Sequence, residues 1–333
     1  MRRAWARRRC CWGHPFELWQ APPWFSERLR QDFPGVEVVQ RKEYGDIEGD
    51  LRDADVAITW SLRPEQVRAA RKLRWIHSPA AAVHALLIPE VVASDVVVTN
   101  ARDVHGPVVA EHAIALVLAL AKRLPSAFRY QQESTWAQDQ ICRESPHPRE
   151  VAGATLGLVG LGSIGLETAK RAAGLGMKVI AVREHADKPQ PACVSKVLVP
   201  NELDEILRVS DYVVLAAPLT PRTRALINRD RLLQMKPGAY LINVSRGALI
   251  DQVALLDALG QHRIAGAALD VFEKEPLPPD SALWKAANVV ITPHTAALTD
   301  KLWERHYALI SENLRRFLAG APLLNIVDKA RGY

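Results

Sequence analysis

The sequence predicts an α/β protein with two doubly wound parallel-sheet domains. Short apolar strand candidates alternate with helical segments between residues 155 and 293, an order typical of a parallel sheet. A shorter series of the same kind spans residues 36–100, and a long apolar helix separates the two. The 333 residues are enough for two domains.

The first series is made of brief apolar runs bounded by polar residues or proline, as buried strands are. The strand candidates are 36–39, 56–59, 73–77 and 96–99, with a helix at 64–71. The apolar helix then opens at Gly106-Pro107, since proline suits a first helical turn, and is expected to stop at Pro125. It is apolar nearly all round, which predicts burial in an interface between domains or between subunits.

The second series contains longer strand candidates. They are residues 155–159, 178–182, 212–216, 239–244, 266–271 and 289–292. A helix over 299–318 follows, and the tail from 323 is expected to return to the first domain. The predicted boundaries are 1–104 and 299–333 for the smaller domain and 105–298 for the larger.

Composition excludes several classes of protein. Hydrophobic residues make up 48% and charged residues 24%, which is ordinary for a packed globular chain. The net charge of +6 comes mostly from the arginines among the first nine residues, interpreted as a solvated tail or a start site placed too far upstream. The nearly neutral remainder offers no basic face for nucleic acid.

The four cysteines form no C-x-x-C pair, so neither a disulfide framework nor a metal site is predicted. The longest apolar run, 113–121, is far shorter than the about 20 residues that span a membrane. No apolar core follows the N-terminal arginines, as it would in a secretory signal. We therefore expect no membrane partner and a cytoplasmic location.

A glycine-rich turn, Gly160-Leu161-Gly162-Ser163-Ile164-Gly165, lies between an apolar strand and a helix. The first glycine permits the tight turn, the second lets a pyrophosphate approach, and the third lets helix and strand pack closely. The motif alone is weak evidence, but its position after a strand and before a helix predicts a Rossmann dinucleotide-binding domain.

The next strand ends at Arg183, where enzymes that use NAD commonly carry an acid for the ribose 2′-hydroxyl. An arginine cannot accept that hydrogen bond, but it can pair with a 2′-phosphate. His185 and Lys188 add positive charge nearby, whereas Glu184 lies one residue late. We predict NADP(H) as the preferred cofactor, with NAD(H) possible.

Three polar residues, Arg246, Glu275 and His294, follow three consecutive strand candidates. Ligands bind outside the carboxyl ends of such strands, so the three should converge on one cleft. A histidine can deliver the proton when a hydride reduces a 2-keto acid, a carboxylate can orient it, and an arginine can grip the substrate carboxylate. Each residue alone has an ordinary surface interpretation; together they predict a catalytic set.

From about residue 97 onward, the chain resembles the D-isomer-specific 2-hydroxyacid dehydrogenase family, in particular glyoxylate and hydroxypyruvate reductases. The matching runs are 156–165, 218–221, 242–247, 268–276 and 291–295. The resemblance implies an oxidoreductase in which His294 is the acid/base, Glu275 assists and Arg246 binds substrate. It also implies a homodimer, and a Rossmann domain inserted in a smaller, flavodoxin-like substrate domain.

The resemblance further implies which residues line the cofactor. They are Gly160, Gly162, Ser163, Ile164, Gly165, Arg183, Pro218, Thr223, Val244, Ser245, Arg246, Asp270 and His294, with Asp270 contacting the nicotinamide carboxamide.

The substrate loop departs from the family pattern. Ala80 and Ala81, expected to bind substrate together with Arg246 and His294, stand where glycines are common, and His84 where an acid is common. Backbone donors survive such a change only if φ stays negative. The residues about 7–12, where the first strand should lie, also form a poor strand pattern.

Alternatives stay open at this point. An enzyme with the same fold could instead act on formate or phosphite. A different class of protein, resembling the C-terminal-binding corepressors, would use dinucleotide binding to control assembly. The substrate and the physiological direction are not specified by these residues.

Overall fold

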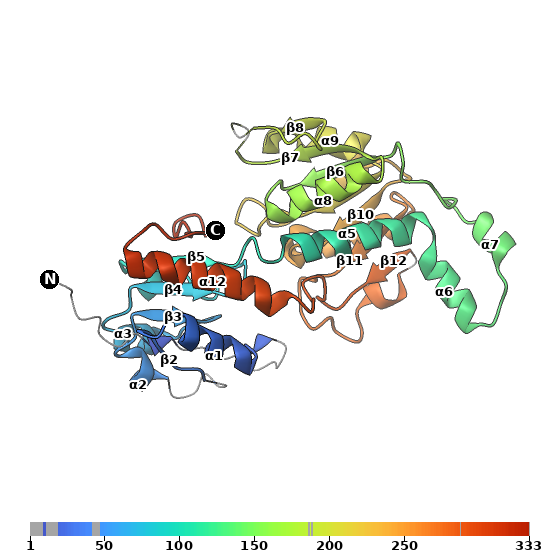
Figure 1. The fold of residues 1–333 in the computed structure, drawn as a ribbon. Helices are drawn as coiled ribbons and strands as arrows, with labels where there is room; N and C mark the ends of the chain where they lie inside the picture. The colour runs from blue at the N-terminus through green and yellow to red at the C-terminus, as the bar shows by residue number, and fades with distance from the viewer. Residues whose placement is uncertain are drawn as a thin grey trace. The chain divides into compact units, whose positions relative to one another are not determined.

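The computed structural model describes residues 9–10, 19–41, 47–185, 187, 189–286 and 288–332 (Figure 1). The chain divides into two compact units, one formed by Met1–His105 with Thr299–Tyr333 and the other by Gly106–Leu298. Each unit is built on parallel strands and has its own hydrophobic core. The predicted α/β class is therefore confirmed.

The larger unit contains a seven-stranded, all-parallel sheet in the order β12-β11-β10-β9-β6-β7-β8. The strands are β6 (Thr155–Val159), β7 (Lys178–Val182), β8 (Lys196–Leu198), β9 (Tyr212–Leu215), β10 (Tyr240–Asn243), β11 (Gly266–Leu269) and β12 (Val289–Ile291). The order reverses direction between β6 and β9, and ligands of doubly wound sheets bind at this switch point. Six of these strands lie where the sequence predicts them; β8 was not predicted.

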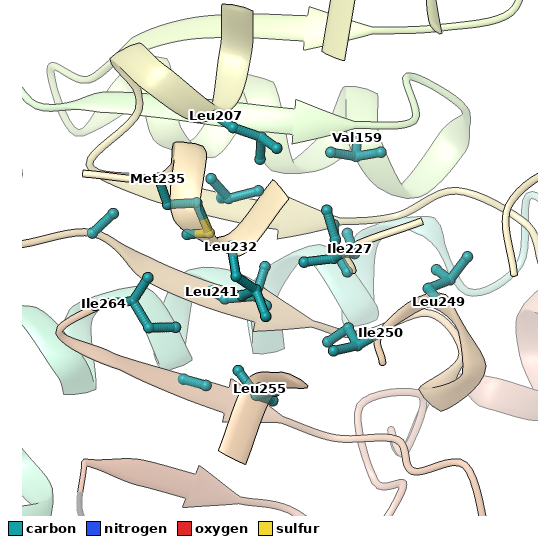
Figure 2. Close-up of a cluster of buried hydrophobic side chains, with 14 of the residues drawn as sticks. Val159, Leu207, Ile227, Leu232, Met235, Leu241, Leu249, Ile250, Leu255 and Ile264 are labelled. Atoms are coloured by element: carbon teal, nitrogen blue, oxygen red, sulfur yellow. The ribbon is translucent and has the colours of Figure 1, made fainter. Parts of the chain in front are cut away.

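Helices cover both faces of this sheet. They are α5 (Gly106–Ala121), α8 (Ser163–Gly174), α9 (Leu203–Val209), α10 (Arg229–Gln234) and α11 (Gln252–Gly260), with short 3-10 turns η2 (Pro200–Glu202), η3 (Gly247–Leu249) and η4 (Ala282–Lys285). Figure 2 shows one core layer, in which Leu207 of α9 and Leu255 of α11 point toward Val159 and Leu241 of the sheet. The other core layer contains residues of α5 and α8.

The apolar helix α5 packs against α8 and the sheet of its own unit. Its apolar character is therefore explained by the core of that unit, so the predicted interface between domains or subunits is not needed to explain it. Pro125 also behaves differently from the prediction, because it lies in the first turn of a new helix, α6 (Leu124–Gln132). The break occurs at Arg123, which adopts a left-handed conformation with φ of 56°. A short helix, α7 (Gln138–Cys142), follows α6.

The smaller unit has two parallel sheets. β1 (Arg9–Cys10) pairs with β2 (Glu37–Val38), and β3 (Val56–Ile58), β4 (Trp75–Ser78) and β5 (Val97–Asn100) form the second sheet. The helices are α1 (Pro23–Asp32), α2 (Glu48–Leu51), α3 (Pro64–Ala69), α4 (Pro89–Val92) and α12 (Leu302–Ala319). The C-terminal tail does return here: Val327 N–H donates to the Val98 carbonyl at 2.8 Å.

Two structural findings bear on possible partners of the chain. Among the described residues, no helix combines the length and apolar character needed to cross a membrane. Within the same residues, no group of histidine, cysteine or acidic side chains is arranged to hold a metal ion. Cys142 and Cys193 are free thiols.

Candidate active site

The glycine-rich turn joins β6 to α8, and each of its glycines meets a different surrounding. Gly160 has φ of 102°, which disfavours any side chain. A Cβ at Gly165 would lie 2.1 Å from the Gly160 carbonyl oxygen, so only glycine allows this helix to pack so closely. A Cβ at Gly162 would meet nothing within 4 Å. The N-cap residue of α8 is Gly162, which makes no side-chain cap. The turn therefore places open space beside a helix N-terminus, which fits the pyrophosphate of a dinucleotide.

Substitutions at the second and third glycines should separate folding from cofactor binding. Gly165→Ala is expected to lower the free energy of unfolding by about 1–3 kcal/mol because its Cβ must displace backbone. Gly162→Ala should cost less stability but weaken NADPH binding, because its Cβ projects into the open space. Urea unfolding and NADPH titration of both variants check this, and equal losses of stability would contradict it.

The loop after β10 holds Arg246 through its neighbours. The buried Asn243 side chain accepts from Ser245 N–H at 3.1 Å and donates to the Arg246 carbonyl at 2.9 Å. The Ser245 hydroxyl donates to the Ala217 carbonyl, at the end of β9. These bonds fix the backbone of Val244 to Arg246 at the carboxyl end of the sheet. The role of Asn243 was not predicted, because an asparagine after a strand gives no hint of which backbone atoms it will bond.

The loops after β10 and β11 touch at Gly247. A Cβ there would lie 1.9 Å from the Phe272 carbonyl carbon. Close backbone contact therefore brings the loop of Arg246 next to the loop of Glu275. Within that second loop, Phe272 N–H donates to Glu275 Oε1 at 2.9 Å, which holds the carboxylate in place.

His294 and Glu275 form a hydrogen-bonded pair, with Nδ1 of the imidazole 2.6 Å from Oε2 of the carboxylate. His294 has φ of 54°, an uncommon conformation for a residue with a side chain, and its N–H donates to the Asp270 carbonyl at 2.8 Å. Among the described residues, none hydrogen-bonds Nε2. The pair therefore engages one ring nitrogen and leaves the other for a ligand.

The electrostatics of these groups agree with a charged carboxylate. Burial would raise the pKa of Glu275, but the hydrogen bonds from His294 and Phe272 and the nearby Arg246 charge outweigh it, so this pKa lies below its usual value. Burial lowers the pKa of the Arg246 guanidinium, and the Glu275 carboxylate opposes that effect. Arg246 and Glu275 are thus near enough to interact electrostatically.

Asp270 is almost fully buried and clamps the segment that carries His294. Its Oδ1 accepts from the Thr292 hydroxyl at 2.6 Å and from Thr295 N–H at 2.9 Å, and its Oδ2 accepts from Ala296 N–H at 3.1 Å. The clamp was not predicted from the sequence, where Asp270 has only the cofactor contact implied by the resemblance.

The remaining cofactor candidates lie at the ends of β7 and β9. Thr223 Oγ1 donates to the Pro218 carbonyl at 2.7 Å, which closes the loop between them. Arg183 Nη2 donates to the Pro189 carbonyl at 3.3 Å. Glu184 pairs with Arg222 at 2.9 Å, and Arg222 was not predicted. Of the other positive residues, His185 is exposed and Lys188 lies outside the described residues.

The substrate-loop candidates belong to the smaller unit. Neither Ala80 nor Ala81 has a positive φ, so the backbone conformation tolerates alanine here. Ala80 N–H donates to Ser78 Oγ at 3.2 Å, and Asn100 Nδ2 donates to the Ala81 carbonyl at 2.7 Å. The loop is therefore built without glycine and is held by two side chains of its own unit.

Comparison with known proteins agrees with this geometry. Residues 114–296 match the family described as D-isomer specific 2-hydroxyacid dehydrogenase, NAD binding domain. A glyoxylate reductase of Korarchaeum cryptofilum is 36% identical over 291 residues, 84% of each chain. A D-3-phosphoglycerate dehydrogenase of Methanocaldococcus jannaschii is 31% identical over 304 residues, which are 90% of this chain and 57% of that one.

Solved structures show the same two-domain fold. A D-isomer specific 2-hydroxyacid dehydrogenase from Xanthobacter autotrophicus Py2, in complex with NADPH and MES, superposes with a TM-score of 0.84 at 33% identity. The match covers 98% of this chain and 100% of that one. The chain therefore belongs to the D-isomer specific 2-hydroxyacid dehydrogenases, which are NAD(P)-dependent oxidoreductases.

Proposed function

We propose that the protein is an NADP(H)-preferring reductase of small 2-keto acids such as glyoxylate or hydroxypyruvate. The observation that carries the proposal is the 2.6 Å bond between His294 and an ionised Glu275 beside Arg246. The glyoxylate reductases among its relatives support this choice of substrate. An intact acid–base pair favours catalysis over a role limited to dinucleotide-controlled assembly.

A nicotinamide dinucleotide held at the turn Gly160–Gly165 would supply or accept the hydride, and residues of the chain bind the substrate and transfer the proton. Glu275 accepts the Nδ1 hydrogen of His294, which leaves Nε2 as the atom that gives a proton to the substrate oxygen. The Glu275 carboxylate stabilises the imidazolium that exists before this transfer. Arg246 binds the substrate carboxylate and polarises the carbonyl. In the oxidative direction, neutral Nε2 accepts the proton.

The substrate range is tested by turnover of glyoxylate, hydroxypyruvate and larger 2-keto acids with NADPH. Formate, phosphite and D-3-phosphoglycerate are assayed in the oxidative direction with NADP⁺ and NAD⁺. We expect the highest kcat/KM for the two small 2-keto acids. Highest turnover of D-3-phosphoglycerate, formate or phosphite would overturn the proposed substrate class.

The cofactor preference rests on Arg183 and on the pairing of Glu184. An unpaired acid here would repel a 2′-phosphate, but Arg222 neutralises it. We expect a higher kcat/KM for NADPH than for NADH. Arg183→Ala should weaken the use of NADPH by about tenfold or more while affecting NADH little, because only NADPH carries the 2′-phosphate. Better use of NADH by the unaltered protein would contradict the preference.

We further propose a homodimer, supported by exposed apolar side chains on the segment α6–α7, which extends from the rest of its unit (Figure 1). Phe128 is 58% exposed and Trp136 is 88% exposed. Large exposed apolar side chains of this kind are typical of interfaces. Sedimentation should show a dimer that Trp136→Glu weakens, whereas a monomeric parent protein would refute it. The cytoplasmic location stays a prediction.

A further inference from the structure

His112 lies on α5 and belongs to none of the sequence motifs that identify the site. Its Nε2 is 3.0 Å from Thr292 Oγ1 and 3.6 Å from Asp270 Oδ1. The ring is only 22% exposed. The helix that carries it packs against β10 and β11, so His112 extends from a fixed support toward the clamp around His294.

The direction of the hydrogen bonds follows from counting protons. A hydroxyl carries one hydrogen, and an ionised carboxylate only accepts. Asp270 already receives two backbone N–H groups, and Thr292 Oγ1 lies 2.6 Å from it. The Thr292 hydrogen therefore points to Asp270, and Thr292 Oγ1 must accept from His112. This fixes the hydrogen of His112 on Nε2.

His112 donates a hydrogen bond to Thr292, and Thr292 donates one to Asp270. This series of hydrogen bonds leads to the loop that carries His294. Asp270 holds the backbone on the C-terminal side of His294, and Thr292 lies two residues before it. The positive φ of His294 is a strained conformation that persists only where surrounding bonds determine it. His112 does not reach the His294–Glu275 bond itself, so any influence on catalysis passes through this loop.

We propose that His112 is a positioning residue that acts through the Thr292 hydroxyl to keep Asp270 and the loop of His294 in the geometry for proton transfer. The inference rests on the proposed acid/base role of His294. It assigns no contact with substrate to His112. The hydrogen bonds require a donor at position 112 of α5 that reaches Thr292 Oγ1. They do not require that this donor be an imidazole.

The test is a double-mutant cycle between His112→Phe, which removes the donor, and Thr292→Val, which removes the hydroxyl while keeping its shape. Each single variant should lower kcat by about tenfold, the size of one hydrogen bond. The double variant should be no slower than the slower single variant, because both substitutions break the same series of hydrogen bonds. His112→Gln and Thr292→Ser, which keep a donor and a hydroxyl, should recover most of kcat.

Several results would overturn the inference. These are a wild-type kcat in folded His112→Phe, multiplicative losses in the double variant, or no recovery in His112→Gln. If His112→Phe does not fold, His112→Gln and the two Thr292 variants decide the outcome by the same recovery criterion. His294→Ala is measured in parallel: if that variant keeps its activity, the acid/base assignment itself fails, whatever the His112 variants do.

Discussion

His294→Ala is expected to lower kcat by about 10²–10⁴-fold, the usual contribution of a positioned acid or base. The substitution removes Nε2, the proposed proton donor, and leaves the glycine turn of β6 untouched. NADPH affinity should therefore remain close to that of the parent protein. Stopped-flow or steady-state turnover gives kcat, and fluorescence titration gives the NADPH affinity.

The matched control is Glu275→Gln, which keeps the hydrogen bond to Nδ1 but removes the negative charge. Glu275→Gln should lower kcat less than His294→Ala does, because Nε2 remains and only the charge that favours the imidazolium is lost. An activity loss of less than tenfold in His294→Ala would rule out His294 as the proton donor.

Arg246→Ala is expected to raise KM for 2-keto acids and lower kcat together. The guanidinium is proposed to bind the substrate carboxylate and also to polarise the carbonyl, so both ground-state binding and the transition state lose a charge-assisted interaction. A loss of about 10²-fold or more in kcat/KM follows from two such hydrogen bonds at 1.5–3 kcal/mol each.

Arg246→Lys is the control that keeps the charge but loses the planar fork. It should recover only part of the loss. If Arg246→Lys restored full activity, a positive charge alone would suffice to bind the substrate carboxylate. The proposed pair of hydrogen bonds from the planar guanidinium would then be wrong. If Arg246→Ala left KM unchanged, the arginine would not bind the substrate carboxylate.

The parts of the fold that depend on buried strands and glycine sterics could be predicted from the sequence. The apolar run of β6 ends at the glycine turn and that of β10 ends at Asn243, so both the strands and the edge that carries the site follow from the pattern. Strand β8 was missed because it has three residues, the first of them the exposed Lys196. Pro125 was misjudged because proline can equally well end one helix or begin the next.

The contacts that support the site could not be predicted, because they join residues far apart in the chain. His112 and Thr292 are 180 residues apart, and His112 lies beside Glu111 in a helix that is otherwise apolar. Arg222 and Glu184 meet across two loops. No local period or spacing encodes such pairs; they appear only when the sheet brings the elements together.

We propose that a hydride passes between NADPH and C2 of a small 2-keto acid while His294 delivers the proton. Turnover of hydroxypyruvate with NADPH deuterated at C4, followed by mass spectrometry of the product, measures this transfer. We expect a D-2-hydroxy acid with one deuterium at C2, formed at a far lower rate by His294→Ala. Bound NADPH with no deuterium transferred to any 2-keto acid of the panel would contradict it.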